Sequence, residues 1–158
     1  MSIILHFDSF NINNIYFVEC VKNNVKQNSY FSRIIYSTDY YALKNIYFKI
    51  NLGNTTFKEQ YLKTIIYFNE KNCSLEQLYN VEREILNDFI EYRNNYNSNN
   101  SNNSNRLIPN YNIQEQCKSG FIKVFKSDNI SNNNTEILIK ISGIWQTGNN
   151  IGVTFKFL

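Results

Sequence analysis

The sequence has very little of what most catalytic sites are built from. It contains one histidine, His6, and no GxSxG, GxxxxGK[ST] or GxGxxG motif. A nucleophilic site needs a base beside its nucleophile and a metal site needs a cluster of ligands, and the sequence shows neither pattern. We therefore expect a protein that is not an enzyme and that has no metal or cofactor. A cleft with converging carboxylates would revive an enzymatic interpretation.

Cysteines and long apolar runs are also scarce. Cys20, Cys73 and Cys117 are scattered without CxxC spacing, which fits neither a disulfide framework nor a zinc site. The opening MSIILHFDSF lacks the basic region and apolar run of a signal peptide. No stretch reaches the roughly 18 apolar residues of a membrane span. We expect free thiols in a reducing intracellular compartment, the cytoplasm or a viral replication site, and no membrane partner.

Proline, glycine and alanine are rare, whereas asparagine and isoleucine dominate the composition. The chain has 1 Pro, 5 Gly and 1 Ala against 29 Asn and 21 Ile, a bias typical of an A+T-rich genome. The Asn-rich tracts therefore say more about the source than about the function. The net charge of +3 is mild, but residues 74–92 carry five acids and one base, a net −4 that leaves +7 for the rest. This asymmetry favours a molecule with one basic side.

Most of the chain is predicted to form strands. Residues 46–52 alternate apolar and polar side chains, and so do residues 61–68, with Gly53 and Asn54 predicted as the turn between them. In the second segment we expect Tyr61, Lys63 and Tyr67 to share a face. Further strands are predicted at 3–7, 15–21, 33–36, 113–116 and 120–126.

One amphipathic helix is predicted over residues 74–92. Ser74 and Gln77 form a capping box, and apolar residues recur after it at helical spacing, typical of a helix that packs on a core. Residues 94–105 are almost entirely Asn and Ser, so we expect a disordered loop there, and residues 129–134 are predicted as a second loop. Residues 1–158 are predicted to form a single domain.

Aromatic and basic residues alternate on several predicted strand faces. Rings can stack on bases and ammonium groups can meet phosphates, a combination suited to unpaired nucleic acid. Aromatic strand formers and solvated lysines are ordinary features, so it is their recurrence that favours a binding surface. The residues we expect to contact nucleic acid are Tyr47, Lys49, Tyr61, Lys63, Tyr67, Phe121, Lys123, Phe125, Lys140 and Lys156. For residues 121–125 the alternative is that the two rings face the core while Ile122 and Val124 face out.

Residues 137–158 are predicted to form a closing hairpin. Ile137, Ile139, Ile141 and Trp145 are expected to face the core, and Gly143 is expected to permit a bulge. The segment Ser142-Gly143-Ile144-Trp145, with Gly152 and Phe155-Lys156-Phe157 after it, resembles closing hairpins of single-stranded-DNA-binding proteins of large DNA viruses and cytoplasmic linear DNA elements. The resemblance covers about 20 residues. The chain departs from many such proteins because it ends Phe-Lys-Phe-Leu and lacks their acidic tail.

The expected fold is mainly β with one amphipathic helix, as an OB-like barrel or a Greek-key β-sheet domain. The expected function is sequence-tolerant binding of single-stranded DNA in replication or repair. RNA as a ligand, homo-oligomers and other replication proteins as partners stay open. The alternative is a structural or assembly protein, such as a viral β-sandwich subunit, whose aromatic strands form protein interfaces.

Overall fold

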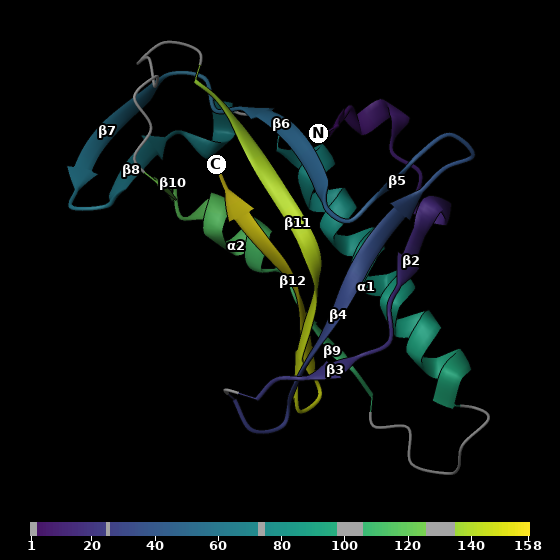
Figure 1. The fold of residues 1–158 in the computed structure, drawn as a ribbon. Helices are drawn as coiled ribbons and strands as arrows, with labels where there is room; N and C mark the ends of the chain where they lie inside the picture. Colours follow the sequence, from purple (N-terminus) through teal and green to yellow (C-terminus); the bar gives the residue numbers. More distant parts are fainter. Residues whose placement is uncertain (1–2, 25, 73–74, 98–105, 126–134) are drawn as a thin grey trace.

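The computed structural model is mainly β, with one large sheet, one small sheet and two α-helices (Figure 1). It describes residues 3–24, 26–72, 75–97, 106–125 and 135–158. The predicted cap Ser74, the predicted loop at 129–134 and residues 98–105 of the other predicted loop lie outside these ranges. One cluster of buried side chains joins both sheets to both helices.

The long strand β11 (Glu136–Thr147) organises the large sheet. It pairs along one side with β12 (Asn150–Phe157), and along the other first with β6 (Ile46–Asn51) and then with β4 (Ser29–Ser37). Shorter strands extend this sheet: β1 (Ile4–Leu5), β2 (Ile15–Phe17), β3 (Val21–Lys22), β5 (Ala42–Leu43) and β9 (Ile108–Asn110). Both sheets are open, so the expected OB-like barrel is not confirmed.

The small sheet is antiparallel, in the order β10-β8-β7. Its strands are β7 (Thr55–Gln60), β8 (Lys63–Phe68) and β10 (Phe121–Phe125). The prediction that Gly53 and Asn54 join residues 46–52 directly to residues 61–68 is wrong, because β7 intervenes and pairs with β8. The Thr55 and Thr135 hydroxyls, 2.6 Å apart and buried, tie the start of this sheet to the start of β11.

Several strand predictions differ from the structure at their ends. Residues 3–7 form only the short β1, because the Ser9 amide donates to the His6 carbonyl (3.0 Å) and closes the 3₁₀ turn η1 (Phe7–Ser9). The 15–21 segment splits into β2 and β3, and residues 33–36 form part of the longer β4. Two further 3₁₀ turns are η2 (Ile12–Asn14) and η3 (Glu70–Asn72).

Two helices replace the single one predicted. Helix α1 (Glu76–Asn97) continues past residue 92, so residues 94–97, predicted as loop, are helical. The tyrosine rings at 92 and 96 are neighbours one turn apart, and the Tyr92 ring contacts Phe17, which gives this last stretch tertiary support. Helix α2 (Asn112–Lys118) occupies residues predicted as a weak strand.

A buried carboxylate explains why α2 is helical. Glu82 of α1 is fully buried, and its two oxygens accept hydrogen bonds from the backbone amides of Ile113 (2.8 Å) and Gln114 (3.0 Å). The first amides of a helix lack partners within the helix, and a carboxylate there also suits the helix dipole. Burial raises the pKa of Glu82, although its two backbone hydrogen bonds oppose the shift.

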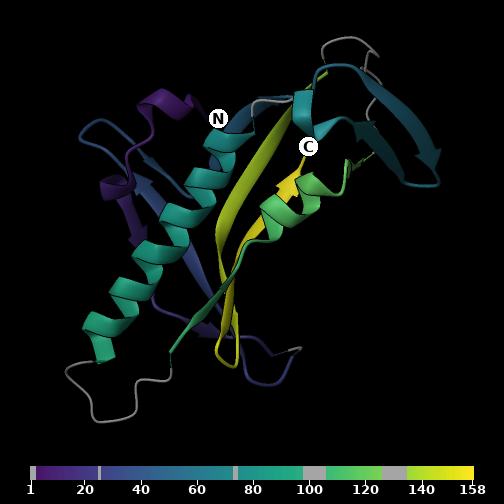
Figure 2. The same cartoon turned by 180° about the vertical axis from the view of Figure 1, so that it is seen from behind.

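Both helices cover the same face of the large sheet. They lie behind β4, β11 and β12 in Figure 1 and in front of them in Figure 2. The apolar side of α1 is buried there, and the inward residues of β6 and β11 meet it in one cluster. Within the described part of the chain no helix covers the opposite face. That uncovered face carries the outward residues of β4, β6, β11 and β12.

Candidate functional site

Strand β10 presents two phenylalanines and a lysine away from the core. Ile122 and Val124 are 0% and 2% exposed, whereas Lys123 is exposed, Phe121 is half-buried and Phe125 is 53% exposed. The predicted orientation of this strand is confirmed, and the alternative with both rings in the core is wrong. Two buried aliphatic side chains anchor the strand and leave the Phe-Lys-Phe side available for contact.

Strand pairing carries two more of the predicted residues to that side. Phe121 lies opposite Tyr67 and Phe125 opposite Lys63, and directly opposed residues share a face of a sheet. The ring centroids of Tyr67 and Phe121 are 6.0 Å apart, and the Lys63 amino group is 5.8 Å from the Phe125 centroid. These four side chains form one aromatic and basic surface on the small sheet.

Tyr61 does not share this surface as the alternation predicted. It forms the turn of the β7–β8 hairpin together with Leu62, and the two side chains are 95% and 63% exposed. The alternating pattern starts only at Lys63, where the strand begins. Tyr61 is therefore an isolated ring at a hairpin tip.

The end of β12 completes the surface. The Lys156 amino group lies over the Phe125 ring, 3.9 Å from its centroid, which is a cation–π contact. On the other side of the same strand, Phe155 and Phe157 pack edge to ring with their centroids 5.5 Å apart. The two sheets thus meet through aromatic and basic side chains.

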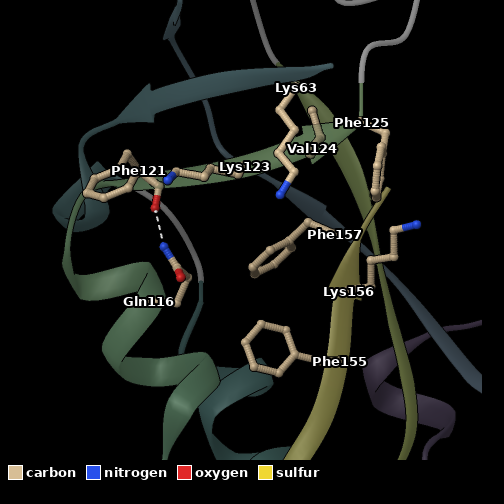
Figure 3. Close-up of a pocket in the computed structure, with 9 residues that line it drawn as sticks. All are labelled: Lys63, Gln116, Phe121, Lys123, Val124, Phe125, Phe155, Lys156 and Phe157. Carbon is tan, nitrogen blue, oxygen red and sulfur yellow. Dashed lines mark hydrogen bonds between the residues drawn. The ribbon is translucent and has the colours of Figure 1, made fainter. Parts of the chain in front are cut away.

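A cavity of about 470 Å³ lies between β10 and the end of β12. In Figure 3 the rings of Phe155 and Phe157 project from β12 into this space and the Lys63 amino group points into it, whereas the Phe121 ring lies at the far edge, turned away from them. The Lys156 side chain points away from that space. The lining residues are Lys63, Gln116, Phe121, Lys123, Val124, Phe125, Phe155, Lys156 and Phe157. Five of the ten predicted site residues are brought together here.

The cavity combines aromatic walls with uncompensated positive charge. Three lining residues are lysines and none is an acid, and these lysines form no ion pair with any residue that the structure describes. The Gln116 amide nitrogen donates to the Phe121 carbonyl at 3.0 Å, which holds the Gln116 side chain at the edge of the space. Such a site suits a ligand that is both flat and anionic.

The uncovered face of the large sheet holds other predicted residues. Lys140 lies directly opposite Tyr47 on one side and Lys156 on the other, so the three side chains form a row. Like charges placed directly opposite each other destabilise a sheet, and a bound anion would relieve that repulsion. Lys49 lies on this face too, but Glu136 forms an ion pair with it and offsets its charge.

The closing hairpin has the predicted bulge, but the bulge reverses the facing that we expected for Trp145. The pairing register shifts between Ile141 and Gly143. Trp145 consequently lies on the uncovered face, opposite to the face of Ile137, Ile139 and Ile141, and is half-buried. A Cβ added at Gly152 would come within 2.5 Å of the indole, so the ring rests directly on that glycine.

Sequence reasoning missed several residues of these surfaces. Phe155 and Phe157 were not among the residues expected to bind, and Gln116 was expected in a strand. Arg33 is exposed and lies opposite Gly143, and the Phe31 ring covers that glycine, so both belong to the uncovered face. The alternation of β12 carried a signal for its two rings. Nothing in the sequence places Gln116 beside them.

No protein-family model, curated protein or solved structure matches the chain. Neither helix in the described ranges is long and apolar enough to cross a membrane.

Proposed function

We propose that this protein binds single-stranded DNA without reading its sequence, in replication or repair. The observation that carries the proposal is that Lys63, Phe121, Lys123, Phe125 and Lys156 all border one cavity whose lining contains no acidic residue. These residues come from three strands that are far apart in the chain. Rings for bases and ammonium groups for phosphates are what a sequence-tolerant single-strand binder combines, and single-stranded RNA offers the same groups.

Lys156 connects the cavity to the uncovered face, which gives the strand a continuous path. Its amino group contacts Phe125 at the cavity, and its backbone position is opposite Lys140, which in turn is opposite Tyr47. A strand that follows this path meets rings and ammonium groups in alternation. Helix α1, which carries five of the 13 acidic residues, covers the other face of the sheet and would not repel the phosphates.

Charge and ring exposure favour an unpaired strand over a protein partner or a duplex. Lysine is depleted at the centres of protein–protein interfaces, whereas it is the residue expected beside phosphates. In a duplex the faces of the bases are stacked on each other, so the exposed ring of Phe125 would find no base to stack on. The proposal therefore predicts weaker binding of duplex than of single strand.

Fluorescence anisotropy with labelled single-stranded and duplex oligonucleotides tests this function. Phe125→Ala is expected to weaken single-strand binding by about 1–3 kcal/mol, the magnitude of one stacked base. Tyr40→Ala is the matched control, because that ring is 93% exposed in the β4–β5 loop. Equal affinity for single strand and duplex, or an unchanged affinity of Phe125→Ala, would overturn the proposal.

An assembly protein is the second candidate, and the β7–β8 hairpin tip is the observation that favours it. Two-residue hairpin turns usually carry Asn, Asp or Gly, but here Tyr61 and Leu62 are exposed at the turn. In an assembly protein these side chains would insert into a second subunit. Under this alternative, the double variant Tyr61→Ser, Leu62→Ser sediments as a smaller species than the original protein in sedimentation velocity. Our proposal predicts that the same variant binds single-stranded DNA with unchanged affinity.

We also propose that the fold is related to OB or Greek-key folds. We propose the same relationship to the single-stranded-DNA-binding proteins of large DNA viruses and cytoplasmic linear DNA elements, which the closing hairpin resembles. The support is the chain order, in which α1 lies between strands β8 and β9.

A further inference from the structure

The cavity differs from a flat stacking surface in having walls on several sides. Its volume of about 470 Å³ lies within the range of small-molecule sites, roughly 300–1,000 Å³. Strand β10 borders the space from the small sheet, and the rings of Phe155 and Phe157 form a wall from β12 (Figure 3). Phe157 is only 5% exposed, so the space reaches down to the edge of the core. A planar group inside it would contact the two rings of β12.

The polar groups of the cavity are complementary to a phosphate and to a base edge. The Lys63 amino group points into the space, and Lys123 lines the same side from the neighbouring strand. The Gln116 amide nitrogen is engaged with the Phe121 carbonyl, so the amide oxygen is the atom that Gln116 can offer to a ligand. A base presents N–H donors on its edge, and an amide oxygen can accept from them.

We infer that the cavity is a nucleotide site. It takes one base out of the bound strand and holds it against Phe155 and Phe157, while Lys63 and Lys123 bind the phosphate next to that base. An apolar molecule would leave the two ammonium groups unused, and a simple anion would leave the aromatic walls empty. A nucleotide uses both, in the way that proteins hold a base extruded from its strand. The inference rests on the proposed function for the strand, although the cavity can be tested without one.

Titration with the separate parts of a nucleotide tests the inference. The side-chain amide signals of Gln116 are followed by NMR while thymidine 5′-monophosphate, thymidine or deoxyribose 5-phosphate is added. The monophosphate is expected to shift these signals and to bind at least roughly tenfold more tightly than either part, a difference of about 1.4 kcal/mol. Equal binding of deoxyribose 5-phosphate, or Gln116 signals that do not shift with the monophosphate, would show that the cavity holds no base.

Two variants separate the cavity from the rest of the surface. Gln116→Trp fills the space with an indole and is expected to abolish binding of the monophosphate. Gln114→Trp adds the same ring to the same helix outside the cavity and is expected to leave binding unchanged. Phe155→Leu keeps an apolar wall without its ring and is expected to weaken binding several-fold, which provides a second test if Gln116→Trp does not fold. Unchanged binding in a folded Gln116→Trp protein and in Phe155→Leu overturns the inference.

The oligonucleotide titration distinguishes failure of this inference from failure of the proposed function. If the protein binds single strands but the monophosphate leaves Gln116 unshifted, the nucleotide site is wrong and the function stands. If the monophosphate binds in the cavity but no single-stranded oligonucleotide binds, the function is wrong and the nucleotide site stands.

Discussion

Removal of the Glu82 carboxylate should destabilise the fold even though the residue does not line the cavity. Glu82 is fully buried on α1 and accepts the amide hydrogens of Ile113 and Gln114, the first residues of α2. Helix α2 in turn positions Gln116 at the cavity. The substitution Glu82→Ala therefore removes the two hydrogen bonds that join α2 to α1.

The expected size of the effect follows from the groups left without partners. Each buried amide that loses its acceptor costs about 1–3 kcal/mol, so two amides give roughly 2–6 kcal/mol. Loss of the buried charge removes a desolvation penalty and offsets part of this cost. We expect a net loss of about 3 kcal/mol, which lowers the melting temperature by roughly 6–12 °C for a domain of this size. Glu82→Gln keeps one acceptor oxygen and should lose less.

Urea denaturation with circular dichroism measures these changes, and Glu84→Ala is the matched control. Glu84 lies on the same helix but is exposed, so its removal should change the free energy of unfolding by less than about 0.5 kcal/mol. A Glu82→Ala protein as stable as the control would refute the capping role of the carboxylate.

The pH dependence gives an independent check with a defined sign. Burial raises the pKa of Glu82 in the folded protein above its ordinary value of 4.5, so the folded state holds this proton more tightly than the unfolded state. The contribution of Glu82 to stability is therefore largest below pH 4.5 and is lost as the pH rises through the folded pKa. The stability difference between the original protein and Glu82→Gln should shrink as the pH rises. A difference that grows with pH would mean that the two helix amides, and not burial, have the larger effect on the pKa of Glu82.

Three further predictions concern the two faces of the large sheet. The double variant Lys140→Ala, Lys156→Ala should have unchanged or slightly higher stability, and the salt slope of its single-strand binding should fall by about 1.4. Lys22 lies on the opposite face by register, so Lys22→Ala should leave that slope unchanged. Charge reversal of Glu76, Glu84 and Glu91 to Lys on α1 should also leave the salt slope unchanged. A larger slope would place the helix beside the bound DNA strand. Gly152→Ala should cost about 1–3 kcal/mol in urea denaturation, because its Cβ would lie 2.5 Å from the Trp145 indole; wild-type stability would show that the ring moves freely.

Local patterns in the sequence were sufficient for several elements. The alternation in residues 121–125 predicted which side chains of β10 are buried, because a strand shows opposite faces to its surroundings at successive residues. The apolar spacing predicted α1, and Gly143 predicted a bulge. The same reasoning failed for Trp145, since one extra residue in a bulge exchanges the faces of everything that follows.

The sequence by itself therefore determined the long helix, strands β6 and β10 and the closing hairpin, and, outside the bulge, which of their sides turn inward. Only the tertiary structure decided the neighbours. Helix α2 forms where Glu82 reaches it from 31 residues away, and Lys63 and Lys156 meet at Phe125 because two separate sheets pack at the end of β12. Periodicity is a local property that one segment carries alone. The cavity depends on strand pairing and helix packing between distant segments, which no local pattern specifies.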